Sequence, residues 1–369
     1  MSKKSLLWLA LLCSLVVVLA GLMGCRSKDP VVVSSPPSTA EVVEEPTEPS
    51  LWPLTGLEAD DGEIILRRVM SVKIDNAPQS GSKVGINSAD VVFETLVEGG
   101  ITRFNAIYQS EIPEFVMPIR SARDSDLYIV PQFGDALLFY SGANNDVLAK
   151  LRSAGIASME HSSVGEVLYT RSPERAAPHN LMVNLVNAYP VARERGFETE
   201  TAEPITGFAF QGEDFDSSTV GQGASQVHIP FSPMSNTSWS WDADKNLWLR
   251  AAGGWPQYDG ATSEQIGFNN VVVIWANHSP GSMAGNVATY DIDLASGGNA
   301  SIFADGRRID GTWEGSMNAP QTFHDSEGNP ILLSPGRTWV SVMRTGESIS
   351  STYDGVADSD YLGEGDTNY

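Results

Sequence analysis

The fold is decided by the stretch Val91-Val92-Phe93-Glu94-Thr95-Leu96-Val97-Glu98-Gly99-Gly100-Ile101-Thr102-Arg103-Phe104, an apolar, β-branched run that leads into two adjacent glycines. Alternate side chains of a strand point to opposite faces, so Glu94 and Glu98 would share one face, about 13 Å apart. The Gly-Gly pair allows a tight turn, and residues 104–109 form a second strand-like run. The stretch predicts a hairpin with Glu98 and Arg103 as a cross-strand ion pair; the other interpretation is that this hairpin lines a cleft.

Around this hairpin, residues 54–211 mix strand and helix signals. Further strand-like runs occur at 69–74 and 136–141, while residues 146–154 and 181–195 have helical spacing and good helix formers. We therefore expect a mixed α/β N-terminal domain over residues 54–211.

Residues 224–346 contain only strand candidates, and they follow a Gly-, Ser- and Asp-rich stretch at 212–223 that is typical of a domain boundary. Asp305-Gly306, between two of the candidates, is a hairpin turn signal. These runs predict a mainly antiparallel, all-β C-terminal domain, so the expected fold class is α+β with two domains. The strand candidates are residues 227–231, 238–241, 247–250, 271–275, 289–294, 301–304, 307–313, 321–324 and 339–343.

The first 24 residues have the pattern of a bacterial lipoprotein signal peptide. Two lysines precede an apolar run that is shorter than the roughly 20 residues of a membrane-spanning helix, and Leu22-Met23-Gly24-Cys25 matches the lipobox. We expect cleavage before Cys25, acylation of its thiol, and anchoring in the lipid bilayer on the extracytoplasmic face of the cell membrane. An ordinary signal peptide or an uncleaved anchor is the alternative. Residues 25–53, rich in proline and glutamate, would form a tether, and the acidic residues 347–369 a disordered tail.

Composition excludes several function classes. Subtracting 46 acidic side chains from 23 basic ones leaves a net charge of −23, which repels nucleic acids. The two cysteines are Cys13, inside the apolar run, and Cys25, so no disulfide framework is possible. The five histidines have no zinc spacing, and no phosphate loop or dinucleotide fingerprint occurs. We therefore expect neither a metal nor a cofactor.

Seven short motifs follow one another along the chain. They are Pro53-Leu54-Thr55-Gly56-Leu57, Ile74-Asp75-Asn76, Ala89-Asp90-Val91-Val92-Phe93-Glu94, Leu96-Val97-Glu98-Gly99-Gly100-Ile101-Thr102-Arg103-Phe104, Pro118-Ile119-Arg120-Ser121-Ala122-Arg123, Ala177-Pro178-His179-Asn180-Leu181 and Pro335-Gly336-Arg337-Thr338-Trp339. Together they resemble the YerB-like bacterial lipoproteins, a family with an N-terminal and a C-terminal domain of unknown function. The resemblance covers nearly all of residues 54–343 and implies a two-domain surface lipoprotein, but no reaction.

The segment from Arg120 to Arg123 predicts an anion-binding site. Ser121 is a candidate N-cap for a helix that runs towards Val130, with Arg123 in its first turn and Arg120 just ahead of it. Two guanidinium groups beside free helix N–H groups suit a carboxylate or a phosphate. The alternative is that both arginines pair with carboxylates inside the domain. The candidate carboxylates are Asp75, Glu94, Glu98 and Asp124.

His179 and Asn180 stand just before the helical spacing of residues 181–195, with Asn180 as a candidate N-cap. His179 could act as a general base or a ligand near neutral pH, or could only cap or pack at the helix start. We expect both residues to complete the ligand-binding set with Arg120, Ser121 and Arg123.

A group of tryptophans marks the β-rich half. Exposed aromatic faces could bind sugar rings of the cell envelope, whereas packing in a β core is the interpretation we favour. The residues are Trp239, Trp241, Trp248, Trp255 and Trp275.

Two function classes remain. The first is a non-catalytic envelope lipoprotein that binds an anionic cell-wall ligand, an anionic small molecule or an envelope protein through the Arg120 and Arg123 region. The second is a cell-wall glycan or peptide hydrolase or transferase, with Asp75, Glu98 and His179 as candidate acid–base groups. Glu94 and Glu98 alone are too far apart for a glycosidase pair, whose carboxylates lie roughly 5 to 9.5 Å apart. The lack of a recognisable nucleophile motif favours binding.

Overall fold

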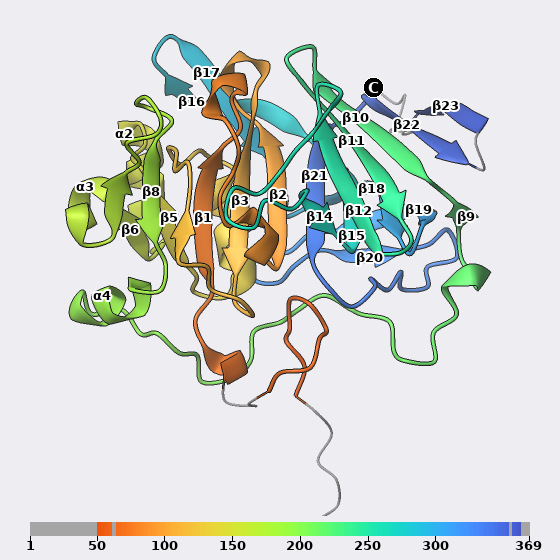
Figure 1. The fold of residues 1–369 in the computed structure, drawn as a ribbon, viewed down its shortest axis with the longest axis horizontal. Coiled ribbons are helices and arrows are strands. Elements are labelled where there is room, and N and C mark those ends of the chain that lie inside the picture. The colour runs from red at the N-terminus through yellow and green to blue at the C-terminus, as the bar shows by residue number, and fades with distance from the viewer. Residues whose placement is uncertain (1–49, 61–63, 354–355, 363–369) are drawn as a thin grey trace, which may run out of the picture. The chain divides into compact units, whose positions relative to one another are not determined.

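The central sheet combines strands from both halves of the chain. A computed structural model describes residues 50–60, 64–353 and 356–362, so the signal segment, Cys25 and most of the expected tether lie outside the described residues. The strand order is β20-β19-β18-β15-β21-β2-β3-β1-β5-β6, and β9 pairs with β19 (Figure 1). The first half supplies β1 (Met70–Asp75), β2 (Val91–Leu96), β3 (Thr102–Tyr108), β5 (Leu137–Tyr140) and β6 (Ser158–Glu160). The second half supplies β9 (Gln222–Gly223), β15 (Asn270–Ala276), β18 (Gly297–Ala304), β19 (Arg307–Glu314), β20 (Thr322–His324) and β21 (Thr338–Arg344).

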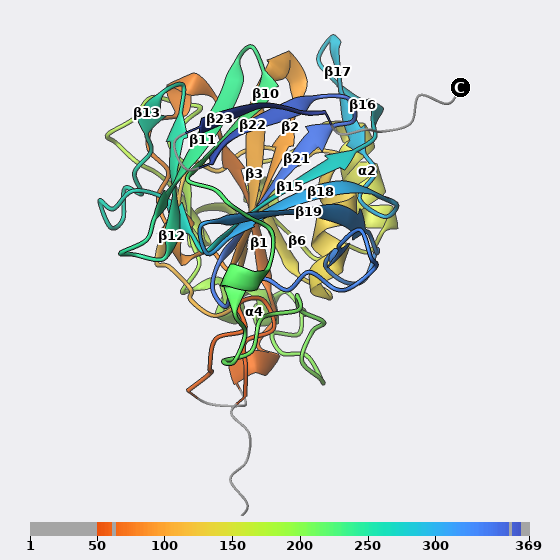
Figure 2. The same ribbon diagram turned by 90° about the vertical axis from the view of Figure 1, so that its right-hand side faces the viewer.

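The two halves join where β2 pairs in parallel with β21, from Val91↔Thr338 to Thr95↔Val342. On its other edge β2 pairs antiparallel with β3, and β21 pairs in parallel with β15. Figure 2 shows these strands side by side in the middle of the molecule. A main-chain ladder therefore connects the regions that the sequence predicts as separate domains.

Both faces of this sheet are covered. The side chains on both faces of its middle strands are therefore buried, which explains why these strands are apolar at nearly every position. Every residue of β2 is buried. Val92 and Leu96 belong to one hydrophobic core, and Val91 and Phe93 belong to a second core. A strand buried on both faces has a nearly continuous apolar sequence, and any charged side chain within it needs a partner.

A second sheet covers one of these faces. Its order is β13-β12-β11-β10-β22-β23, and β14 pairs with β12. Trp239 and Trp248 of this sheet pack in the same core as Trp339 of β21, and the rings of Trp239 and Trp339 meet at a centroid distance of 5.1 Å. The strands are β10 (Gln226–Ser232), β11 (Ser235–Asp242), β12 (Leu247–Ala252), β13 (Trp255–Pro256), β14 (Gly267–Phe268), β22 (Ser348–Tyr353) and β23 (Val356–Leu362).

The remaining elements are short. Two small sheets contain β4 (Phe115–Val116), β7 (Tyr169–Arg171) and β8 (Leu181–Asn184), and the hairpin β16 (His278–Ala284) and β17 (Val287–Ile292). The α-helices are α1 (Asp126–Ile129), α2 (Asn145–Ser153), α3 (His161–Val164) and α4 (Ala188–Glu194). Seven 3-10 helices connect strands in the described part of the chain, among them η4 (Glu98–Gly100).

The structure confirms the α+β class and most of the predicted elements. The four strand runs and the helix at 146–154 in the first half are present, as are all nine strand candidates of the second half. Asp305 and Gly306 form the predicted hairpin turn between β18 and β19, both with positive φ.

The predicted helix over residues 181–195 and the predicted tail differ from the structure. The helix over residues 181–195 is wrong in its first part, because Leu181–Asn184 alternates buried and half-buried side chains and pairs with β4 and β7; helix begins only at Ala188. The tail from 347 onward is not wholly disordered, because β22 pairs with β10 and buries Ile349. Acidic residues further along the tail hid this strand pattern, and residues 363–369 lie outside the described residues.

Candidate functional site

Asp75, at the end of β1, lies between the side chains of His179 and Arg120. Its buried Oδ2 accepts a hydrogen bond from His179 at Nδ1, 2.6 Å away, and forms an ion pair with Arg120 Nε at 3.2 Å. Its Oδ1 accepts from the backbone N–H of Ala77 at 3.0 Å. The side chains of His179 and Arg120 are 21% and 24% exposed. Three of the predicted site residues thus meet at one buried carboxylate.

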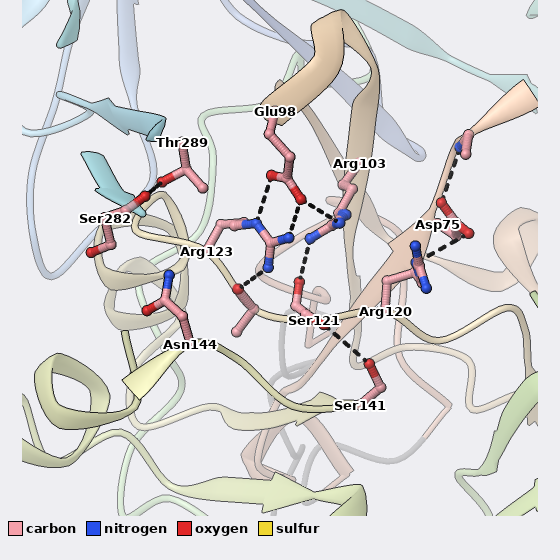
Figure 3. Close-up of polar contacts among 12 residues, drawn as sticks. Asp75, Glu98, Arg103, Arg120, Ser121, Arg123, Ser141, Asn144, Ser282 and Thr289 are labelled. Atoms are coloured by element: carbon pink, nitrogen blue, oxygen red, sulfur yellow. Dashed lines mark hydrogen bonds and ion pairs between the residues drawn. The ribbon is translucent and has the colours of Figure 1, made fainter. Parts of the chain in front are cut away.

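Glu98 lies between two arginines in the turn after β2 (Figure 3). Arg103 Nη2 donates to Glu98 Oε1 at 3.0 Å, and Arg123 holds both carboxylate oxygens, with Nε at 2.8 Å from Oε2. Burial raises the pKa of Glu98, but the Arg123 hydrogen bonds and the two positive charges outweigh it and lower that pKa to about 2. Glu98 is therefore ionised at neutral pH and is no general acid.

The hairpin prediction and its Glu98–Arg103 ion pair are confirmed. Gly99 and Gly100 adopt positive φ values of 76° and 71°, which a residue with a side chain rarely adopts. One detail was wrong. The strand ends at Leu96, so Glu98 belongs to η4 and does not share a strand face with Glu94.

The predicted helix start at Ser121 is also wrong. The backbone N–H groups of Arg120 and Ala122 donate to Lys73 and Gly142, which keeps this segment extended, and α1 begins only at Asp126. Ser121 contributes its carbonyl oxygen to Arg103 Nη1 at 3.0 Å. Because Arg120 pairs with Asp75 and Arg123 pairs with Glu98, the structure shows the internal pairing that was the alternative.

Asn180 does not cap a helix, because it precedes the strand β8. Its Oδ1 accepts from Arg171 at 2.7 Å, and its Nδ2 donates to the carbonyl oxygens of Ser172 and Arg175. This buried amide therefore fixes the loop that carries His179.

Arg103 of β3 connects the surroundings of Asp75 and Glu98. Asp75 and Arg103 are cross-strand partners of β1 and β3, so Arg103 stands between the two carboxylates. Figure 3 shows two neighbouring groups of polar contacts, one with Arg123, Glu98 and Arg103 and the other with Asp75 and Arg120. We call Asp75, Glu98, Arg103, Arg120, Arg123 and His179 the arginine cluster.

A cavity of about 400 Å³ lies next to the residues that follow β1. One wall comes from residues 76–83 and from Glu94 of β2. The other wall comes from β11, β12 and the residues around β13. The lining residues are Asn76, Ala77, Pro78, Gly81, Lys83, Glu94, Met234, Ser235, Asn236, Thr237, Ala252, Gly253, Trp255 and Gln257.

Glu94 is a fully buried carboxylate in this lining. Arg250 Nη2 lies 3.0 Å from both of its oxygens, Thr102 Oγ1 donates at 2.7 Å, and Trp339 Nε1 donates at 3.2 Å. The guanidinium of Arg250 lies over the rings of Phe104 and Trp339, with centroid distances of 5.1 and 4.9 Å. The pair is thus compensated in charge and enclosed by aromatic side chains.

Lys83 lines the same cavity without such compensation. It is 4% exposed, and its Nζ donates to Ser80 Oγ at 2.7 Å and to the Gly81 carbonyl at 2.8 Å. No carboxylate lies within 4.0 Å of Nζ in the part of the chain that the structure describes. Burial, and then the nearby Arg250 charge, lower the pKa of Lys83 to about 7.

Some of the tryptophans pack in the core, and one is exposed as a sugar-binding residue would be. Trp239, Trp248 and Trp275 are buried, as core packing predicts. Trp255 is 77% exposed and lines the cavity, as does Met234, which is 60% exposed. The cavity therefore has a buried amine in its lining and an open aromatic face at its rim.

Family models match the chain in two consecutive blocks. The N-terminal domain of a protein of unknown function, DUF3048, matches residues 54–198, and the C-terminal domain of the same family matches residues 227–340. The chain belongs to the DUF3048 family. In these terms the cavity lies between the two DUF3048 domains: Lys83 and Glu94 come from the first, and Trp255 and Gln257 from the second.

A relative of known name spans both DUF3048 domains. The Bacillus subtilis (strain 168) protein named "Putative lipoprotein YerB" is 26% identical over 331 residues, which is 90% of this chain and 94% of that protein. The crystal structure of the YerB protein from Bacillus subtilis superimposes with a TM-score of 0.72 at 25% identity, covering 82% of this chain and 99% of that chain. The YerB-like resemblance and the two-domain α+β architecture are thus confirmed.

Among the described residues, no helix is long and apolar enough to cross a membrane. Within the same ranges, no three His, Cys, Asp or Glu side chains are grouped so that they could hold a metal ion.

The sequence indicates the burial of some cavity residues but not of others. Glu94 lies within a run that reads as buried, and a buried carboxylate requires a cation, so its pairing could have been expected. Arg250 follows Leu247-Trp248-Leu249 in a strand and carries the same signal. Lys83 lies in a turn-rich segment that looks like any exposed loop, and nothing in the sequence predicts its burial.

Proposed function

We propose that this DUF3048 protein is tethered to the cell membrane through acylated Cys25, on the extracytoplasmic face, and binds an anionic ligand of the cell envelope in the cavity between its two domains. The signal pattern and the lipobox support the tether, as does the name of the Bacillus subtilis relative. The observation that carries the binding function is the position of Lys83 in the cavity lining.

Charge balance around the cavity explains the preference for an anion. Glu94 is neutralised by Arg250, so this pair adds little net charge. Lys83 has only hydroxyl and carbonyl partners, and a cation in that position gains most from an anionic ligand. The remainder of a chain with a net charge of −23 repels anions, which confines anion binding to such a local site.

The cavity replaces the Arg120 and Arg123 region as the place of binding. In the arginine cluster each guanidinium already has a carboxylate at hydrogen-bond distance. An anion that arrived there would have to displace Asp75 or Glu98, both of which are built into the sheet and its hairpin.

Binding is tested by calorimetric titration of the full-length protein in detergent with glycerol 3-phosphate and with cellobiouronic acid, a disaccharide that contains glucuronate. We expect at least one of these anions to bind the wild type at least tenfold more tightly than it binds Lys83→Met. Lys245→Met, which removes an exposed lysine of a hairpin turn, is the matched control and should bind like the wild type. Equal binding by Lys83→Met and wild type, or no binding of either anion, would refute the function.

The tether is tested separately by Cys25→Ser. This variant should leave the membrane pellet and appear in the soluble extracytoplasmic fraction. If Cys25→Ser stays in the membrane pellet at the wild-type level, the lipid anchor is wrong.

An acid–base function has one observation in its favour. The Asp75–His179 hydrogen bond of 2.6 Å orients a partly exposed imidazole, as in sites where a carboxylate supports a general base. A cell-wall hydrolase or transferase that uses this pair would release soluble fragments from purified cell walls, and His179→Asn would abolish that release. If the wild-type protein releases no fragments, the alternative fails.

A further inference from the structure

The walls of the cavity between the domains carry hydrogen-bonding side chains without charge. Asn76, Asn236 and Gln257 contribute amides, and Ser235 and Thr237 contribute hydroxyls. The Oγ1 of Thr237 is buried and has no hydrogen-bond partner among the described residues. An unsatisfied buried hydroxyl in a cavity wall is accounted for when a ligand supplies the partner.

The rim of the cavity adds a flat apolar face. Trp255 belongs to β13, a two-residue strand at the edge of the second sheet, and its side chain stands in solvent instead of packing in the core. Exposed tryptophans that line a cavity serve ligands with an apolar face and a polar edge, because the indole ring attracts the electropositive C–H groups of such a ligand.

A pyranose ring has this combination of surfaces. Its axial C–H groups form an apolar face for an aromatic ring, and its hydroxyls form an edge that pairs with amides and hydroxyls. A cavity of about 400 Å³ falls within the roughly 300 to 1,000 Å³ of small-ligand pockets, so it is large enough for a short saccharide.

Peptides and nucleotides fit these features less well. A peptide would need a long open sheet edge for its backbone groups, whereas the edge strand in this lining, β13, has only two residues. A polyphosphate carries several negative charges, which the single amine of Lys83 cannot balance against the net charge of −23 of the whole chain. A ligand with one acidic group and several hydroxyls meets neither difficulty.

We propose that the ligand is an acidic saccharide, with a sugar ring stacked on Trp255 and its acidic group at Lys83. The inference rests on the proposed binding function and names the chemical class of its ligand. Trp255 and Lys83 then have separable tasks: the first recognises the ring, and the second recognises the charge.

The experiment compares cellobiouronic acid with cellobiose, its neutral counterpart, and with glycerol 3-phosphate, an anion without a ring. Calorimetry on the full-length protein in detergent should show that cellobiouronic acid binds at least tenfold more tightly than either of the other two. Trp255→Ala should weaken both disaccharides at least tenfold and leave glycerol 3-phosphate unchanged. Lys83→Met should remove the preference for cellobiouronic acid over cellobiose.

Val186→Ala serves as a control, because Val186 is 56% exposed but does not line the cavity. If glycerol 3-phosphate binds as tightly as cellobiouronic acid and Trp255→Ala changes neither affinity, the saccharide class is refuted while the anion-binding function stands. If no anion depends on Lys83, both proposals fail.

Discussion

The arginine cluster and the cavity between the domains differ in whether their buried basic side chains have carboxylate partners. In the arginine cluster Glu98 has two guanidinium partners, and Asp75 has Arg120 and His179. In the cavity Glu94 and Arg250 neutralise each other, and Lys83 remains with uncharged partners. Both regions contain basic side chains inside a strongly acidic protein, yet of the two only the cavity has a basic side chain without a carboxylate partner.

This difference shows that basic residues close together in sequence do not by themselves indicate a binding site. Arg120 and Arg123 are prominent in the sequence, but their contacts are those of structural ion pairs. A buried pair contributes mainly to the specificity of the fold, because desolvation offsets much of its attraction. A buried amine without a counter-charge has the desolvation cost but no attraction to offset it, and a function is then the simplest reason for its presence.

The largest effect should come from breaking the pair below the cavity. Arg250→Met leaves Glu94 as a buried, uncompensated carboxylate, so we expect unfolding free energy to fall by roughly 3 to 5 kcal/mol. Urea unfolding followed by circular dichroism measures the loss. Arg152→Met removes an exposed arginine of α2 and should change stability by less than about 0.5 kcal/mol. Similar midpoints for the two variants would show that the Glu94–Arg250 pair does not stabilise the fold.

The next effect concerns the arginine cluster. Replacing Arg120 and Arg123 together by glutamine should cost roughly 2 to 4 kcal/mol, less than Arg250→Met, because Arg103 still faces Glu98 and His179 still faces Asp75. Anion affinity at the cavity should stay at the wild-type value. A double variant that melts like the wild type but no longer binds glycerol 3-phosphate or cellobiouronic acid would return the binding site to Arg120 and Arg123.

Much of the fold could be predicted, and the reason is visible in β2 and β15. Both strands are buried on two faces, so their continuous apolar sequences indicate strands whatever the neighbouring elements are. The partners of such strands could not be predicted. The parallel pairing of Val91–Thr95 with residues 338–342 joins positions about 250 residues apart, and no local pattern contains that register.

The site was less predictable than the fold. Asp75, Glu98, Arg120, Arg123 and His179 do come together, but the sequence could not decide whether the arginines face a ligand or a carboxylate, since that depends on which strands lie side by side. Lys83 was missed because its burial is produced by a loop of the second domain, in which Asp259 accepts backbone N–H groups from Gly85 and Asn87 and holds the 78–88 segment in place.

A smaller effect follows from the low pKa of Lys83. The pKa of about 7 in the folded state lies below the 10.5 of an ordinary lysine, so between these values the unfolded chain binds more protons and wild-type stability rises with pH. Lys83→Met has no titrating amine at this position and lacks this pH-dependent contribution to the unfolding free energy. The unfolding free energy of Lys83→Met relative to wild type should therefore fall by about 1 kcal/mol or more from pH 7 to pH 10. A pH-independent difference between the two proteins would contradict the lowered pKa.

The smallest effect is on affinity. An anion prefers protonated Lys83, so its affinity should be greatest below pH 7 and should decrease, by about tenfold per 1.4 kcal/mol of lost attraction, as the pH rises well above the pKa. The charged groups that act on Lys83 from the elements around it are Arg250, Asp75, Arg175 and Glu94. Calorimetric titration with cellobiouronic acid at pH 6, 7 and 9 measures the trend, and a constant affinity would exclude Lys83 as the ligand's counter-charge.

The parallel pairing of β2 with β21 also sets an order of events during biogenesis. A chain that emerges from a ribosome or an export channel N-terminus first presents β2 long before residues 338–344 become available. Until then one edge of β2 has unpaired backbone groups, and the N-terminal DUF3048 domain cannot complete its sheet. A nascent chain truncated before residue 338 is thus an unfinished fold with an unpaired sheet edge, and the central sheet is completed only when a strand from about 250 residues further along the chain arrives.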